Sequence, residues 1–263
     1  MNAPLPPVSV IVPAYREAGN LEALANRVFA ALHDQDVSGE LVIVDDDSRD
    51  GTEELARRLG ERLPVRLVVR QGVRGLSSAV ITGFQHARHD RFVVLDADLQ
   101  HPPELIPSLL TLLNREDCDF VIGTRYGPEG RIDENWPVCR RWMSRLATAM
   151  ARPLAPLSDP MSGFFALRRE VWMRAEDLDP VGYKIALELF VKCACRHPAE
   201  VPIRFAPRHA GASKMSAKVQ WQYLRHLWRL YCFRFPILAA GGMVLGLGAG
   251  AALGWWALDR VWR

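Results

Sequence analysis

Residues 93–104 read VVLDADLQHPPE, and this stretch indicates both the fold class and the site. The apolar run from Arg91 to Leu95 is typical of a buried strand, and it ends at two carboxylates, Asp96 and Asp98. Two prolines then suit the first turn of a helix. Open α/β sheets bind ligands at the carboxyl ends of their strands, where two oxygen ligands suit a divalent metal that carries substrate phosphates. The alternative is that these carboxylates only cap the strand and the next helix.

The rest of the chain alternates short apolar runs with segments of helical periodicity. The predicted strands cover residues 8–13, 40–44, 65–69, 92–95, 120–123 and 200–206, with a further short strand after the loop 159–165. The predicted helices cover residues 21–32, 50–63, 76–87, 103–113, 137–154, 181–195 and 216–235. Asp50 is the expected N-cap of the second helix, and Glu53 three residues later would complete a capping box. Such alternation predicts an α/β fold with a mostly parallel sheet and helices on both faces.

Composition narrows the class of protein. With 263 residues, one large α/β domain is the expected arrangement. The five cysteines are odd in number and lack metal-ligand spacing, which indicates a reducing compartment. No acidic residue lies between Glu200 and Asp259, whereas seven basic residues do. This asymmetry indicates an anionic ligand or a membrane surface, and no motif for binding nucleic acid accompanies it.

The C-terminal end of the chain has the character of a membrane anchor. Residues 236–258 carry no charge and are long enough to cross a hydrocarbon core of about 30 Å, so they predict a single transmembrane helix. A buried helix of a globular domain is the alternative. Glycines recur at every fourth position and predict a helix face for self-association or for a membrane partner: Gly242, Gly246, Gly250 and Gly254.

The segment before this span mixes tryptophans with arginines. Residues 216–235 therefore predict an amphipathic juxtamembrane helix, although a helix simply packed on the sheet is almost as good an interpretation. The arginines favour a cytoplasmic side for the preceding domain. We expect a catalytic domain over residues 1–215 on the cytoplasmic face of a single-pass protein of the inner (cytoplasmic) membrane.

Phosphate-binding glycine loops are missing. The chain has no G-x-G-x-x-G after the first strand and no G-x-x-x-x-G-K-[ST], which argues against a dinucleotide-binding fold and a P-loop NTPase. A diphosphate would then be held by a metal at Asp96 and Asp98 and by basic side chains. Near the first strand, Tyr15 offers a ring for stacking and Glu17 offers an acceptor, while Asp46 follows the second strand.

Eight segments in order resemble the family 2 glycosyltransferases, which have the GT-A nucleotide-sugar fold, and within them the polyprenol-phosphate (dolichol-phosphate) mannosyltransferases. They are VSVIVPAYREAGNL, LVIVDDDSRDGT, GLSSAVITGF, VVLDADLQHPPE, VIGTRYG, SDPMSGFFALRR, GYKIALELF and RHAGASKMS. The resemblance extends from about residue 8 to about residue 235. The DADLQHPPE and DPMSGFF segments point to the polyprenol-phosphate branch rather than to polysaccharide synthases.

The resemblance implies roles for individual residues in three groups. The nucleoside would be held by Pro13, Tyr15, Glu17, Val44 and Asp46. The ribose, diphosphate and metal would be held by Asp96, Ala97 and Asp98, with Asp98 and Gln100 as direct ligands of Mg²⁺ or Mn²⁺ and with Arg208 and Lys214 on the nucleotide phosphates. The sugar or the acceptor phosphate would be met by Arg125, Lys184, Arg140 and Ser162. Among these, Asp98, Arg125 and Lys184 are the expected catalytic residues. Asp47 stands where relatives usually show Gly or Asn.

The expected reaction is an inverting transfer of a hexose, mannose from GDP-mannose, onto a polyprenyl (dolichyl or undecaprenyl) monophosphate. A lipid monophosphate with a second pKa near ~6 is already anionic at neutral pH, so it needs no strong general base. The alternatives are a UDP-glucose or UDP-amino-sugar donor, or a catalytically silent nucleotide-binding membrane adaptor. A soluble sugar nucleotidyltransferase would need a glycine-rich, basic segment after the first strand, which this chain lacks.

Overall fold

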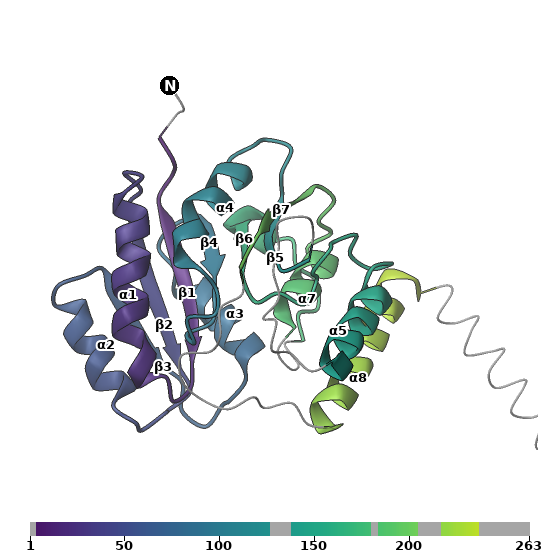
Figure 1. Cartoon of the computed structure of the whole chain (residues 1–263), viewed down its shortest axis with the longest axis horizontal. Coiled ribbons are helices and arrows are strands. Elements are labelled where there is room, and N and C mark those ends of the chain that lie inside the picture. The colour runs from purple at the N-terminus through teal and green to yellow at the C-terminus, as the bar shows by residue number, and fades with distance from the viewer. Residues whose placement is uncertain (1–3, 127–137, 180–183, 205–216, 237–263) are drawn as a thin grey trace, which may run out of the picture.

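A seven-stranded sheet forms the centre of the computed structural model, which describes residues 4–126, 138–179, 184–204 and 217–236 (Figure 1). The strands are β1 (Val8–Ala14), β2 (Gly39–Asp45), β3 (Val65–Val69), β4 (Arg91–Val94), β5 (Phe120–Thr124), β6 (Phe165–Arg168) and β7 (Pro198–Pro202). The helices are α1 (Ala18–His33), α2 (Thr52–Gly60), α3 (Leu76–His86), the short 3₁₀ helix η1 (Pro103–Leu105), α4 (Ile106–Leu113), α5 (Val138–Ala151), α6 (Arg169–Trp172), α7 (Ile185–Lys192) and α8 (Ala217–Arg234).

The sheet is mostly parallel, which confirms the prediction. Its order is β3-β2-β1-β4-β6-β5-β7, and only β6 among these strands runs antiparallel to its neighbours. Because β6 is reversed, the loop that leads into it reaches the same edge as the carboxyl ends of the other six strands. This reversal brings residues 158–164 to the edge where an α/β sheet binds ligands.

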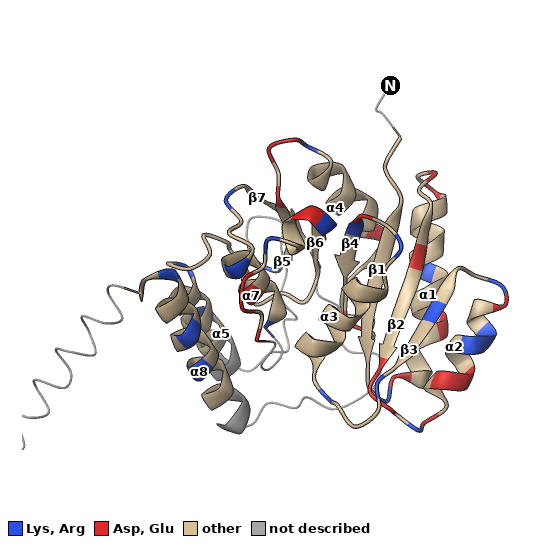
Figure 2. Cartoon of the chain, turned by 180° about the vertical axis from the view of Figure 1, so that it is seen from behind, with Lys and Arg blue, Asp and Glu red and all other residues tan. Residues whose placement is uncertain are grey.

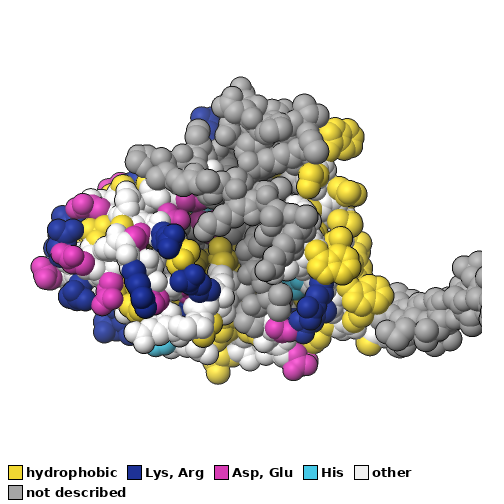
Figure 3. Space-filling view, turned by 90° about the horizontal axis from the view of Figure 1, so that it is seen from below, with side chains coloured by type: hydrophobic (Ala, Val, Ile, Leu, Met, Phe, Trp, Pro, Cys, Tyr) yellow, Lys and Arg dark blue, Asp and Glu magenta, His cyan; other side chains and the backbone are white. Residues whose placement is uncertain are grey.

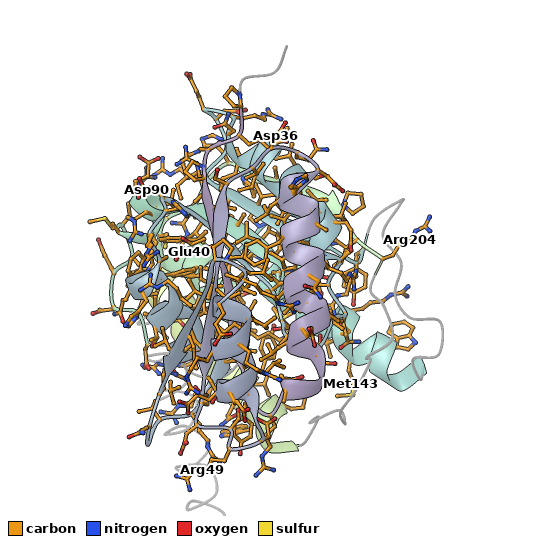
Figure 4. All side chains as sticks on the ribbon, turned by 90° about the vertical axis from the view of Figure 1, so that its left-hand side faces the viewer. Asp36, Glu40, Arg49, Asp90, Met143 and Arg204 are labelled. Atoms are coloured by element: carbon orange, nitrogen blue, oxygen red, sulfur yellow. The ribbon has the colours of Figure 1, made fainter. Side chains whose placement is uncertain are left out.

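Two apolar clusters cover the two faces of the sheet. One cluster joins the strands to α1, α2 and α4, and the other joins them to α3, α5, α7 and α8. The central strands are buried on both faces, so they appear in the sequence as continuous apolar runs without alternation. In Figure 4, Asp36 and Asp90, which precede β2 and β4, lie at one end of the molecule, and Arg49, which follows β2, lies at the opposite end.

Two predicted details are wrong. The last strand was expected over residues 200–206 but covers Pro198–Pro202, because the Asp119 carboxylate accepts hydrogen bonds from the amides of Arg196 and His197 and fixes the start of the strand. The capping box of α2 does not form, since Gly51, at φ 91°, precedes the helix. Asp50 instead accepts from the amide of Thr52 at 3.1 Å, and Glu53 pairs with Arg57.

The C-terminal part of the described chain is a long helix at one end of the molecule. Helix α8 occupies the stretch expected to be amphipathic, and it lies beside α5 (Figure 1). Tyr223 and Tyr231 donate from their hydroxyl groups to backbone carbonyls of α5, at 2.8 and 2.7 Å. None of the helices that the structure describes is both long and apolar enough to cross a membrane. Residues 237–258 of the predicted span lie outside the described residues.

The contact between α3 and β1 depends on a glycine. A Cβ added at Gly83 would overlap Cγ2 of Ile11 and lie 3.1 Å from its Cγ1. We expect Gly83→Ala to lower the free energy of unfolding by about 1–3 kcal/mol, because the overpacked side chain outweighs the better helix propensity of alanine. Urea unfolding would measure this. Gly19→Ala in α1 is the control, because no atom lies within 4 Å of its added Cβ, and an equal loss in both variants would contradict the packing argument.

Candidate active site

The predicted site residues gather at one edge of the sheet. Pro13 and Val44 lie near the carboxyl ends of β1 and β2. Tyr15 and Glu17 follow β1, Asp46 follows β2, residues 96–100 follow β4, and Arg125 follows β5. Ser162 lies in the loop before the reversed strand β6, and Lys184 immediately precedes α7. The fold thus brings together segments that are up to 171 positions apart in the chain, from Pro13 to Lys184.

The segment after β4 is a tight turn. The amide of Leu95 donates to the carbonyl of Ile11 at 3.2 Å, so Asp96 begins beside the end of β1. Leu99 has a left-handed backbone (φ 61°), and the Asp98 carboxylate accepts from the amide of Gln100 at 3.2 Å. The alternative that these carboxylates cap the next helix receives no support, because η1 starts at Pro103 without a side-chain cap.

Two neighbours fix the carboxylate of Asp96. Nδ1 of His101 lies 3.4 Å from the Asp96 amide and 3.6 Å from its Oδ2, and the imidazole stacks on Phe164. Burial lowers the pKa of His101 to about 4, so the ring is neutral at neutral pH. On the other side, a Cβ at Gly163 would come within 3.0 Å of Asp96 Oδ2. A glycine at position 163 therefore leaves room for the Asp96 carboxylate, which a larger residue would displace.

The turn after β4 has a suitable donor set for a divalent metal. The buried carboxylate of Asp98 and the amide oxygen of Gln100 are hard ligands, and a metal of this kind usually takes its remaining ligands from phosphates and water. Within the described part of the chain, no three His, Cys, Asp or Glu side chains form a complete metal cluster. Asp98 and Gln100 together fit a divalent metal whose remaining ligands would come from phosphates and water.

Arg125 and Lys184 form the basic side of the site, and a buried ion pair holds Arg125. The guanidinium of Arg125 donates to both carboxylate oxygens of Asp159, at 2.7 and 2.9 Å, and the Arg125 amide adds a third bond at 3.2 Å. Burial disfavours the charged guanidinium, but Asp159 outweighs this effect and raises the pKa of Arg125. Arg125 therefore stays charged in a fixed orientation.

Lys184 completes this basic side. Its ammonium donates to the carbonyl of Met161 at 3.1 Å, in the loop that also carries Asp159 and Ser162. Burial and, next, the charge of Arg125 lower the pKa of Lys184 from its ordinary value of 10.5 to about 8, against the opposing effect of Asp159 and Asp96. Two cations thus lie close to each other and to the carboxylate of Asp96, an arrangement that favours an incoming anion.

The loop before β6 is anchored on its other side as well. Oγ of Ser158 donates to Glu200 at 2.6 Å and lies 2.6 Å from Oγ1 of Thr124, so β5 and β7 both hold it. Ser162 is buried, and its Oγ accepts from the amide of Phe164 at 3.2 Å. These hydrogen bonds hold the loop that Arg125 and Lys184 contact.

A cavity lies near the residues predicted to hold the nucleoside, although none of those residues lines it. The guanidinium of Arg74 lies over the ring of Tyr15 at 4.6 Å, and Glu17 accepts from Asn20 at 2.7 Å. A cavity of about 620 Å³ opens beside them, and its lining residues are Arg16, Asp47, Ser48, Arg49, Asp50 and Arg74. In Figure 4, Arg49 stands at the end of the molecule where the parallel strands finish.

Asp46 has a structural partner in addition to its expected role. Its Oδ1 accepts from Nε of Arg70 at 2.8 Å, and its Oδ2 accepts from the amide of Gly75 at 2.8 Å. Arg70 also donates to Oγ of Ser78 at 2.8 Å. Asp46 therefore ties β2 to the loop before α3, and a contact of Asp46 with a nucleoside stays a prediction.

Three predicted residues lie outside the described side chains: Arg140, Arg208 and Lys214. Conversely, three residues that hold the site were not among the sequence candidates: Asp159, His101 and Arg70. Asp159 and His101 stand in the segments SDPMSGFF and DADLQHPPE, and Arg70 directly follows a strand. The position of Arg70 at a strand end was a signal, as was the place of Asp159 and His101 in segments that resemble the family. The partners of Asp159 and Arg70, however, are far away in the sequence.

The lowered pKa of Lys184 predicts a stability effect. Between pH 8 and 10.5 the unfolded chain binds more protons at this site, so the stability of the wild type rises with pH there, whereas below pH 8 the buried charge costs free energy in full. We expect Lys184→Met to be more stable than the wild type by about 1–3 kcal/mol at pH 7. Unfolding in urea at several pH values should show this advantage shrink as the pH approaches 10.5. A pH-independent difference would contradict the prediction.

Comparisons with known proteins identify the family of this chain. The family model described as "Glycosyl transferase family 2" matches residues 9–174, more than half of the chain. A dolichol-phosphate mannosyltransferase from Mycosarcoma maydis is 48% identical over 238 residues, which cover 88% of this chain and 81% of that protein. A protein of the same name from Pyrococcus furiosus is 43% identical over 253 residues, 92% of this chain and 70% of that protein.

The fold is similar to that of a solved structure. Glucosyl-3-phosphoglycerate synthase from Mycobacterium tuberculosis, in complex with Mn²⁺ and UDP-glucose, aligns with a TM-score of 0.62 and 24% identity. The alignment covers 85% of this chain and 77% of that chain. This likeness shows the GT-A-like α/β fold. The family match and the two sequence relatives together show that this chain is a glycosyltransferase and belongs to glycosyl transferase family 2.

Proposed function

We propose that this chain transfers mannose from GDP-mannose onto a polyprenyl monophosphate, with inversion at the sugar carbon. One observation carries the proposal: Arg125, just after β5, and Lys184, just before α7, both donate hydrogen bonds to the loop that enters β6, at Asp159 and at the carbonyl of Met161. Paired buried cations next to a donor site suit an acceptor that is itself an anion. Both sequence relatives are named dolichol-phosphate mannosyltransferase, which supports this acceptor class.

The chemistry requires positioning more than proton transfer. The acceptor phosphate has a second pKa near ~6, so its oxygen is nucleophilic at neutral pH without a strong base. Arg125 and Lys184 would offset its repulsion from the donor diphosphate and place it in line with C1 of the sugar. A single displacement then inverts C1, and the bond to the nucleoside diphosphate breaks.

The donor would bind along the carboxyl ends of β1, β2 and β4. Asp96 and Ala97 would hold the ribose and diphosphate, and Asp98 and Gln100 would hold Mg²⁺ or Mn²⁺, which when bound supplies positive charge against the leaving diphosphate. Arg208 and Lys214 would add charge from the segment outside the described residues. Pro13, Tyr15, Glu17, Val44 and Asp46 would surround the nucleoside beside the 620 Å³ cavity.

An apolar end of the molecule supports a lipid acceptor. Helices α5 and α8 expose large apolar side chains, with Trp142 68%, Leu146 62%, Trp221 70% and Trp228 56% exposed. Figure 3 shows hydrophobic side chains gathered at this end, and Figure 2 shows basic positions along α8. Tryptophans and arginines on one helix suit the interface of an anionic bilayer. Tyr223, Leu227 and Leu230 are buried on the other side of α8, so this helix both packs on the domain and presents an apolar face.

The anchor itself follows from the sequence. Residues 236–258 would cross the membrane once, with the catalytic domain of residues 1–215 on the cytoplasmic side. Gly242, Gly246, Gly250 and Gly254 would form the contact face for a second copy or another membrane protein.

A UDP-sugar donor is the rival proposal. It has one specific observation in its favour, since the structural neighbour from Mycobacterium tuberculosis was solved with UDP-glucose. A competition between donors decides between the two proposals.

The decisive experiment is a transfer assay with purified full-length protein. We expect radiolabelled mannose to move from GDP-mannose into the lipid fraction in the presence of polyprenyl phosphate and Mn²⁺, and label from UDP-glucose to move at least about 10-fold more slowly. Label from neither donor in the lipid would refute the proposed function. Faster transfer from UDP-glucose would establish the rival.

The assay has an internal control for the metal site. We expect Asp98→Asn to lower transfer by at least about 100-fold because it removes a carboxylate that would face the metal and diphosphate. Asp117→Asn, at an exposed carboxylate paired with Arg115, is the matched control and should leave transfer unchanged. Full activity of Asp98→Asn would remove Asp98 from the site.

Gly163 predicts a separate effect on donor binding. In Gly163→Ala the new methyl group would push against the Asp96 carboxylate, which can move because its side chain is 32% exposed. We expect GDP with Mn²⁺ to bind about 10-fold more weakly in calorimetry, with stability changed by less than about 1 kcal/mol. Gly19→Ala is again the control. Unchanged GDP binding would show that Asp96 does not contact the donor.

A further inference from the structure

A polar cluster is buried between α7 and α8, away from the substrate-binding edge. Glu188 of α7 is 1% exposed and His226 of α8 is 5% exposed. Nε2 of His226 lies 3.4 Å from Oε2 of Glu188, and Lys192 Nζ lies 3.0 Å from Oε1. A cavity of about 380 Å³ adjoins this cluster.

Stability alone does not account for this cluster. Helix α8 already packs on the domain through Tyr223, Leu227 and Leu230, all nearly fully buried. Burying charged groups costs free energy, and apolar side chains of similar volume often stabilise such a position at least as well. Buried polar contacts can instead specify how two helices are aligned. The cluster between α7 and α8 has the properties of such an alignment contact.

The cluster reaches both sides of Lys184. Glu188 lies one turn after Lys184, and its amide donates to the Lys184 carbonyl at 3.4 Å. The carboxylate of Glu188 accepts a hydrogen bond from the amide of Asp179 at 2.9 Å, and Asp179 precedes Lys184 in the chain. Arg229 of α8 pairs with the carboxylate of Asp179. Helix α8 therefore contacts the chain both upstream and downstream of the lysine that would meet the acceptor phosphate.

We propose that Glu188 and His226, supported by the pair of Arg229 with Asp179, are positioning residues through which α8 aligns Lys184 with the acceptor phosphate. This inference rests on the proposed function, because it assigns Lys184 to the acceptor and α8 to the membrane surface. Seating α8 on the bilayer would set the position of α7, so that the phosphate-binding lysine is aligned where the lipid substrate resides.

The test uses the full chain with farnesyl phosphate as acceptor, in detergent and with phosphatidylcholine and phosphatidylglycerol vesicles. We expect His226→Leu to raise KM for farnesyl phosphate about 10-fold with kcat changed much less, since a small misplacement of a binding group is costly. Binding of GDP should stay as in the wild type. Any stimulation of the wild type by vesicles should be reduced in the variant. His226→Gln, which keeps a polar N–H group beside Glu188, should restore most of the acceptor affinity.

Tyr231→Phe is the matched control. It also removes a polar contact of α8, the partly buried 2.7 Å bond to the carbonyl of Met150, but that contact joins α8 to α5 and not to α7. We expect KM for farnesyl phosphate to change by less than about twofold in this variant. An equal rise in KM for both variants would reduce the role of His226 to general support of α8 and would overturn the inference.

A double variant separates the inference from the proposed function. If His226 acts through Lys184, adding His226→Leu to Lys184→Met should raise the acceptor KM little further, because the lysine it positions is gone. Full additivity would overturn the inference. If Lys184→Met alone leaves the acceptor KM unchanged, the assignment of Lys184 in the proposed function fails. If Lys184→Met raises this KM while His226→Leu does not, the inference fails alone.

Discussion

The ion pair of Arg125 with Asp159 is the contact on which the acceptor side of the site depends. It joins the end of β5 to the loop that enters β6, and both side chains are nearly excluded from solvent, at 11% and 0% exposed. Removing one partner from such a pair leaves an uncompensated buried charge, which typically costs about 3–5 kcal/mol. The same loop carries the carbonyl that holds Lys184 and the glycine that leaves room for Asp96. One buried contact therefore holds the loop against which Arg125, Lys184 and Asp96 all lie.

Only the reversed strand makes this contact available. A parallel strand in the place of β6 would start at the opposite edge of the sheet, and residues 158–164 would then lie far from Arg125. Hydrogen bonds of Ser158 with Glu200 extend the same support to β7. The antiparallel strand is thus a functional feature of this sheet, because it brings a loop to an edge that otherwise receives only the carboxyl ends of strands.

The sequence predicted what local patterns determine. Apolar runs that end in carboxylates, as at Leu95 to Asp98, predict both the strand and its polar end, because a strand buried on both faces shows no alternation. Long-range partners left no such pattern: nothing near Asp159 indicates Arg125, and nothing near Asp46 indicates Arg70. The prediction of a capping box at Asp50 was wrong, because Gly51, with a left-handed backbone, takes the N-cap position and the helix begins at Thr52. Candidate residues were therefore predictable one by one, whereas their mutual support was not.

The charges at the acceptor side explain why the site needs this support. Burial and, next, the charge of Arg125 lower the pKa of Lys184 to about 8, so keeping this lysine charged in the folded chain costs free energy. An anionic phosphate placed between the two cations would recover that free energy, and a neutral hydroxyl would not. The arrangement thus favours a phosphate acceptor over a sugar hydroxyl before any other contact forms. Both cations must also be held by contacts within the protein, because their mutual repulsion would otherwise turn Lys184 toward solvent. Asp159 holds Arg125, and the carbonyl of Met161 holds Lys184.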